Sequence, residues 1–264
     1  MSVMAPEMEV SESEYFVNQG SIVRQIWGKS DTILFIFAGA AAEFALSKAV
    51  DWLYFTGRLP SDPLGRLFST VNYAKRIVFS RRKEAYQAID SITTIHGSVE
   101  AKRGYQIPDW AYRDVLFMLI DYSIRAYELL ERPLTHAEYE EVLRVFNQLG
   151  ERMQIPNLPH DFSAWQTMRE DHLLKHLAFS DYTADLFQQY RKHLGVVRYR
   201  MLLDLQAFVV PPRVRELMGF KRKTLLRLMI HGYKLSRIIR LDGFIKSLVL
   251  PSVYKQQIKA LDES

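Results

Sequence analysis

The chain has 264 residues, of which 48% are hydrophobic and 25% are charged. This composition is ordinary for a folded globular protein, and 15 Phe with 14 Tyr can fill a sizeable core, so disorder as the main state is excluded. The sequence contains no cysteine. Disulfides, Cys-ligated zinc, iron–sulfur clusters, thiolate-ligated haem and covalently attached c-type haem are therefore excluded as well.

The N-terminal region is acidic and carries no basic residue before Arg24. A signal peptide needs a positively charged start followed by an apolar run, and neither is present. The longest apolar stretch, residues 32–42, is about half a membrane span. We therefore expect a cytoplasmic protein without a transmembrane helix.

The first clear helix start is Ser61-Asp62-Pro63, which combines a capping residue with a proline in the first turn. Arg66 and Thr70 follow on one face of this predicted helix, four residues apart. A guanidinium and a hydroxyl together can bind an anion or donate hydrogen bonds to a reactive oxygen species. The same pair is also common on solvated helix surfaces.

His96 lies on an apolar stripe with Ile89, Ile92 and Val99, where another isoleucine would be expected. The structural interpretation is a buried histidine bonded to a carbonyl group. The functional interpretation is a metal ligand, because a neutral imidazole in an apolar pocket is the usual proximal ligand of haem iron.

The middle of the chain predicts two further helices. Residues 109–131 are apolar nearly all round, which indicates a helix at the centre of the protein. Residues 134–153 begin with a capping box formed by Thr135 and Glu138 and then show one apolar face. Period-two alternation between hairpin turns is missing from the sequence. The sequence thus predicts an all-α protein of eight to ten helices, with residues 1–264 forming a single helical domain.

His172 and His176 are spaced to share one face of a helix. The glutamate of a zinc protease motif is missing between them, and no third ligand is evident in the sequence. We therefore interpret them as two surface or half-buried histidines on a polar face.

The C-terminal part is strongly basic. Residues 195–264 carry a net charge of +9, whereas the first 194 residues carry −4. Seven basic residues and no acidic one lie between Lys221 and Arg240. This segment is either a solvated face, which Gly232 favours because it weakens a continuous helix, or an amphipathic segment in peripheral contact with an anionic membrane. No recognition motif accompanies the charge, so nucleic acid is not an expected partner.

Several short motifs, taken in order, resemble the MpaB-like oxygenase family, which also contains the latex-clearing protein, a rubber oxygenase. They are Arg66-x-x-x-Thr70, Ile95-His96-Gly-Ser-Val99 with Gly104-Tyr105, and Pro133-Leu-Thr-His-Ala-Glu138. The resemblance continues through residues 156–159 to 211–215 and covers roughly residues 20–220. Residues 221–264, which carry many basic side chains, are expected to form a helical C-terminal extension.

The resemblance implies an all-helical, globin-like core that holds one haem b. His96 falls at the family's proximal iron ligand, and Arg66 and Thr70 fall at its distal arginine and threonine. Ser69 stands where the rubber oxygenase has a lysine that can cap the iron, which argues against rubber cleavage. Lys48 and Asp51 are further candidates for facing the same pocket.

The resulting hypothesis is a haem-dependent oxygenase or related oxidoreductase acting on a small or lipid-like apolar substrate, with O₂ or peroxide as oxidant. In this hypothesis His96 holds the iron, and Arg66 and Thr70 stabilise developing negative charge on oxygen. Two alternatives remain open: a non-catalytic haem- or ligand-binding helical protein, and a helical scaffold without a cofactor.

Overall fold

Two helix starts follow the capping residues that the sequence predicts. Helix α8 (His136–Arg152) begins after Thr135, whose side chain accepts from the Glu138 amide while the Glu138 carboxylate accepts from the Thr135 amide. Helix α5 (Pro63–Phe79) begins after Asp62, whose carboxylate accepts from the Gly65 amide at 2.8 Å. These bonds satisfy backbone donors that the first turn of a helix leaves unpaired. Both predicted starts are confirmed.

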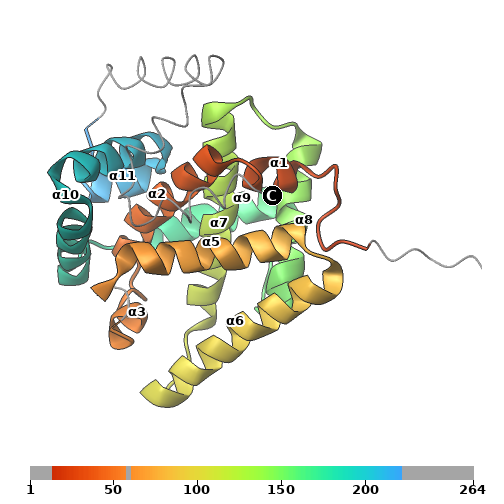
Figure 1. Cartoon of the computed structure of the whole chain (residues 1–264), viewed down its shortest axis with the longest axis horizontal. Coiled ribbons are helices and arrows are strands. Elements are labelled where there is room, and N and C mark those ends of the chain that lie inside the picture. The colour runs from red at the N-terminus through yellow and green to blue at the C-terminus, as the bar shows by residue number, and fades with distance from the viewer. Residues whose placement is uncertain (1–13, 58–60, 222–264) are drawn as a thin grey trace, which may run out of the picture.

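The computed structural model describes residues 14–57 and 61–221, which contain ten helices and no strand (Figure 1). Besides α5 and α8 these are α1 (Ile22–Trp27), α2 (Ser30–Leu46), α3 (Asp51–Phe55), α6 (Arg82–Arg103), α7 (Asp109–Leu130), α9 (Phe162–Lys175), α10 (Asp181–Val209) and α11 (Pro212–Leu217). The predicted all-α fold is confirmed for the described residues, whereas its extension over residues 1–264 and its globin-like character stay predictions. The predicted C-terminal extension lies, from residue 222 on, outside the described residues.

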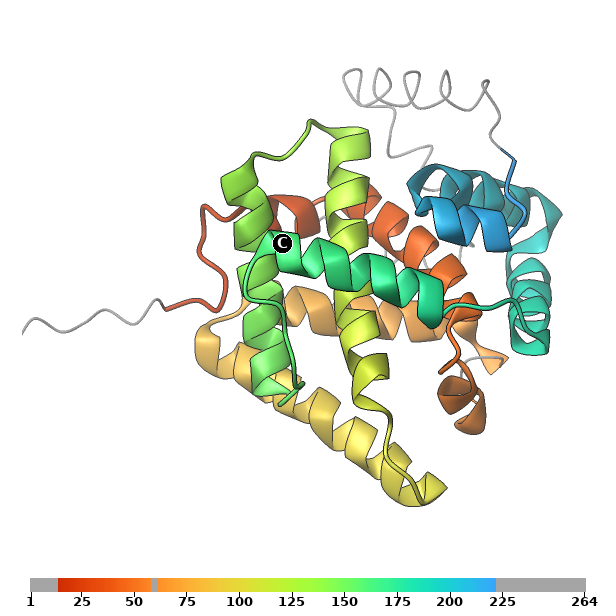
Figure 2. The same cartoon turned by 180° about the vertical axis from the view of Figure 1, so that it is seen from behind.

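Helices α2 and α7 form the centre of the molecule. Helix α2 is buried along most of its length and packs against both α7 and α10. Helix α7 buries Phe117, Ile120 and Tyr122 almost completely, as expected for a helix that is apolar nearly all round. Helix α9 crosses α7 on the side seen in Figure 2. The predicted central position of residues 109–131 is confirmed.

The longest described helix, α10, is interrupted at Gly195. This residue has φ 73° and ψ 171°, a conformation that L-residues with a side chain rarely adopt. The helix therefore changes direction there and is seen as two segments in Figure 1. Among the described helices, none combines the length and the apolar character that a membrane crossing requires.

Gly39 allows α2 to approach its neighbours closely. A Cβ atom at this position would overlap the ring of Tyr122 on α7 and would lie 2.8 Å from Cγ1 of Val209 on α10. Both partners belong to buried side chains, so neither can move aside without disturbing the core. The missing side chain thus sets the spacing of three central helices.

We expect Gly39→Ala to lower the free energy of unfolding by about 1–3 kcal/mol, because overpacking outweighs the gain in helix propensity. The matched control is Gly97→Ala in α6, where a Cβ meets nothing within 4 Å. That change should raise the free energy of unfolding by about 0.5–1 kcal/mol. Urea denaturation measures both, and a Gly39→Ala variant as stable as the wild type would contradict this account.

Candidate functional site

A large cavity lies between the central helices. Its volume is about 910 Å³, near the upper end of the roughly 300–1,000 Å³ typical of ligand sites. Most of its lining is apolar and includes Phe37, Ala41 and Phe44 of α2, Val115 and Leu119 of α7, and Tyr190 and Leu194 of α10. The cavity therefore suits a ligand of substantial size with a mainly apolar surface.

The structure brings all four sequence candidates to the wall of this cavity. His96 comes from α6, and Arg66, Ser69 and Thr70 come from α5, which packs against α6. The Thr70 hydroxyl donates to the Arg66 carbonyl at 3.1 Å, so the two residues share one turn of α5. The functional interpretation requires these four residues to share one cavity, and they do. Their roles toward a cofactor stay predictions.

His96 has an unusual environment for a histidine in an apolar wall. Its Nδ1 atom is buried and has no hydrogen-bond partner among the described residues, so the interpretation of a histidine satisfied by a carbonyl does not describe this atom. Burial, reinforced by the positive charge of Arg66, lowers the pKa of His96 and outweighs the carboxylate of Glu100. His96 is therefore a neutral imidazole that retains its capacity to bind a metal.

Tyr112 is a residue of this wall that the sequence analysis missed. Its ring centroid lies 5.2 Å from that of His96. Its hydroxyl donates to Glu100 at 3.1 Å, and the same carboxylate oxygen accepts from the Ile107 amide at 2.8 Å. Glu100 thus fixes Tyr112 beside His96. The signal in the sequence was weak, because Tyr112 is one of several hydroxyl-bearing residues in the predicted central helix, with Tyr122, Ser123 and Tyr127.

Lys48 and Asp51, proposed from the sequence as further pocket residues, are not among the described residues that line the cavity. The Lys48 ammonium donates to the Lys175 carbonyl at 2.6 Å. Asp51 forms an ion pair with Arg103, with 2.5 Å between Oδ2 of Asp51 and Nη2 of Arg103. The hypothesis that they face the pocket is wrong, because both are engaged by partners elsewhere.

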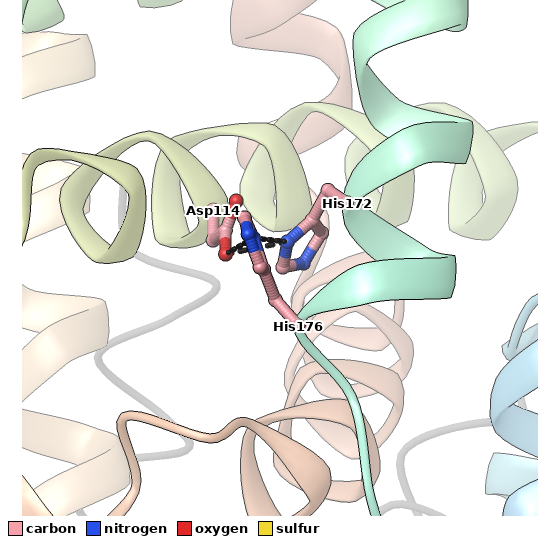
Figure 3. A group of neighbouring side chains, drawn as sticks. All are labelled: Asp114, His172 and His176. Carbon is pink, nitrogen blue, oxygen red and sulfur yellow. Dashed lines mark hydrogen bonds and ion pairs between the residues drawn. The ribbon is translucent and has the colours of Figure 1, made fainter.

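His172 and His176 are placed differently from the sequence interpretation. His172 is only 3% exposed, and both histidines contact the same oxygen of Asp114 on α7, His172 Nδ1 at 2.5 Å and His176 Nδ1 at 2.7 Å (Figure 3). The interpretation as surface or half-buried histidines is therefore wrong for His172, which is buried, and confirmed for His176, whose side chain is 25% exposed. Asp114 is the third metal-ligating group that was not evident in the sequence. The missed signal was Asp114 together with Asp121, two acidic residues seven positions apart in a helix that is apolar nearly all round.

Arg169, three residues before His172 in α9, is a buried arginine. Arg169 of α9 donates to both oxygens of Glu43 on α2 at 2.6 and 2.7 Å, and to Asp121 on α7 at 2.9 and 3.0 Å. Burial disfavours the charged carboxylate, but the charge of Arg169 and hydrogen bonds from His172 and Arg169 prevail and lower the pKa of Glu43 to about 2. Glu43 is therefore ionised in the core.

The sequence matches a family model described as ER-bound oxygenase mpaB/B'/rubber oxygenase, catalytic domain, over residues 25–240. The protein belongs to this oxygenase family, as the order of its motifs predicts. Membership places it among oxidoreductases of the oxygenase type. Neither a curated protein nor a solved structure gives a significant match to the chain.

We expect Arg66→Gln to raise the pKa of His96, because it removes a positive charge that disfavours the imidazolium. Arg66→Lys is the matched control, since it keeps the charge and should change the pKa much less. Titration of the histidine ring signals by NMR in the haem-free protein measures both values. Equal His96 pKa values in the wild type and Arg66→Gln would show that the two side chains are not coupled.

Proposed function

We propose that this protein is a haem b-dependent oxygenase that acts on a small or lipid-like apolar substrate. One observation carries the proposal: His96, with a buried and unpartnered Nδ1, shares the wall of a 910 Å³ apolar cavity with Arg66 and Thr70. Membership of an oxygenase family supports it.

The residues present fit a haem. The cavity has the size and apolar lining for a tetrapyrrole, and its wall includes the cationic Lys102 and Arg198, which suit carboxylate groups. A lowered pKa keeps His96 neutral, as an iron ligand must be. When bound, haem b supplies the iron centre at which O₂ or peroxide is activated.

Arg66 and Thr70 would act through hydrogen bonds. Arg66 offers several N–H donors in a fixed fork, and the Thr70 hydroxyl can turn from its own helix toward a ligand in the cavity. Donors already in place where negative charge develops stabilise that charge without reorganisation. The apolar walls exclude water and would bind the substrate through its hydrocarbon surface.

Ser69 borders the cavity beside Thr70. Its hydroxyl is short and a weak ligand, so in this proposal no side chain at position 69 competes for the iron. The distal side would then stay available for oxidant and substrate. A non-catalytic haem-binding protein is the alternative, and it would bind haem without consuming O₂ or peroxide.

The proximal ligand is tested by His96→Ala. We expect this variant to lose stoichiometric haem binding, because the chain has no cysteine and His96 is the one histidine among the described residues that line the cavity. His136→Ala is the matched control, since its side chain is 83% exposed on α8. The Soret absorbance after haem addition is the measurement. Full occupancy with an unchanged spectrum in His96→Ala would reject this ligand.

The distal residues are tested by Arg66→Met and Thr70→Val. Both variants should keep haem but consume O₂ or peroxide about ten- to a hundredfold more slowly, because a hydrogen bond to a charged group contributes about 1.5–3 kcal/mol. Asn72→Ala changes an exposed residue of the same helix and should leave turnover unchanged. Undiminished turnover in both distal variants would make these residues structural. A haem-loaded wild type that consumes neither oxidant would favour the non-catalytic alternative.

A further inference from the structure

Asp114, His172 and His176 form a compact group of metal-ligating atoms outside the cavity. Asp114 comes from α7, His172 lies in the last turn of α9, and His176 follows at its C-terminal end. The two Nδ1 atoms are 3.1 Å apart, and both face Oδ2 of Asp114 (Figure 3). None of the three residues is among those that line the cavity.

The surroundings of His172 determine which nitrogen is available. Its Nε2 atom is buried and faces a carboxylate, with Glu43 Oε1 3.5 Å away. The position of Glu43 is fixed by its two hydrogen bonds from Arg169. A carboxylate close to one imidazole nitrogen favours protonation of that nitrogen. The other nitrogen is then the one that can bind a metal. Nδ1 of His172 is therefore the atom directed at Asp114.

The buried carboxylates in this region outnumber the arginines that pair with them. Glu43, Asp114 and Asp121 are all buried carboxylates. Arg169 pairs with Glu43 and Asp121, and the partly exposed Arg125 also pairs with Asp121. Within the described residues, Asp114 contacts neither arginine nor lysine, only the two histidines. Its charge is compensated either by an extra proton on an imidazole or by a metal ion.

The geometry suits a metal ion with an open position. Ligand atoms around a tetrahedral Zn²⁺ lie roughly 3.3 Å apart, so the 3.1 Å between the two Nδ1 atoms is already close, and only the Asp114 oxygen has to retract. The His176 side chain is 25% exposed and packs against Trp110, so the group reaches solvent. Two imidazoles and one carboxylate with open positions are a ligand set used for Zn²⁺ and Fe²⁺.

We propose that Asp114, His172 and His176 bind a divalent transition-metal ion at a site separate from the cavity. The ion neutralises Asp114, links the end of α9 to α7, and leaves its remaining position to water. This site does not depend on the function proposed for the cavity.

Calorimetric titration of the full chain with Zn²⁺, after removal of metals by a chelator, tests the site. We expect one equivalent to bind with micromolar or tighter affinity, and Asp114→Asn and His176→Gln each to weaken binding about a hundredfold or more. His160→Gln is the matched control and should leave Zn²⁺ binding unchanged. His160 is an exposed histidine that also has a carboxylate partner, with its Nε2 atom 3.0 Å from Oδ2 of Asp161. Zn²⁺ should also raise the unfolding temperature of the wild type and of His160→Gln, but not of His176→Gln.

No binding of Zn²⁺ by the wild type would overturn the proposal and assign the compensating charge to a proton. Binding of undiminished affinity in His176→Gln would overturn it too. His176 is partly exposed, so this variant keeps the test valid if Asp114→Asn does not fold, and far-UV circular dichroism checks both. Loss of binding in the folded ligand variants, with retention in His160→Gln, supports the site.

Discussion

The buried guanidinium of Arg169 is the interaction on which the arrangement of the central helices depends. It joins Glu43 of α2 to Asp121 of α7 from a third helix, α9, and all three groups are almost inaccessible to solvent. Two carboxylates without this partner would remain as uncompensated charges in the core, which is strongly destabilising. Ridges of apolar side chains permit several ways for helices to slide, whereas a bidentate ion pair permits essentially one. Arg169 thus fixes the register of α2 against α7 and α9.

Because of this register, α2 and α7 present apolar residues on one side and charged residues on another. Ala41 and Phe44 of α2, with Val115 and Leu119 of α7, face the cavity. Glu43 and Asp114 belong to the same two helices but meet Arg169 and the histidines of α9 instead. The apolar lining of the cavity and the buried charged groups therefore lie on different sides of these two helices. The cavity stays free of these carboxylates, which would disfavour an apolar ligand.

Local signals in the sequence were sufficient for much of this structure. The capping oxygens of Asp62 and Thr135 act within three residues, so the helix starts could be read directly. His96 stood out on an apolar stripe and Arg66 on a helix face, the order of short motifs then assigned both to one site, and the structure brings both to one cavity. Asp114 could not be assigned to His176 in this way, because 62 positions separate them and only the packing of α7 on α9 brings them together. The bend at Gly195 could not be predicted either, because a single glycine in a helix is compatible with several conformations.

The two histidine environments show why residue type alone does not define chemistry. Burial opposes the charged form of both His96 and His172. At His96 the nearby charge of Arg66 acts in the same direction, so its pKa falls and the ring is neutral. At His172, hydrogen bonds to Asp114 and Glu43 outweigh burial, and its pKa rises. The first environment suits a neutral metal ligand in an apolar wall, and the second suits positive charge from a proton or a metal ion. The groups that decide between them, Arg66 on α5 and the two carboxylates on α2 and α7, act on each histidine only because the helices are packed in this order.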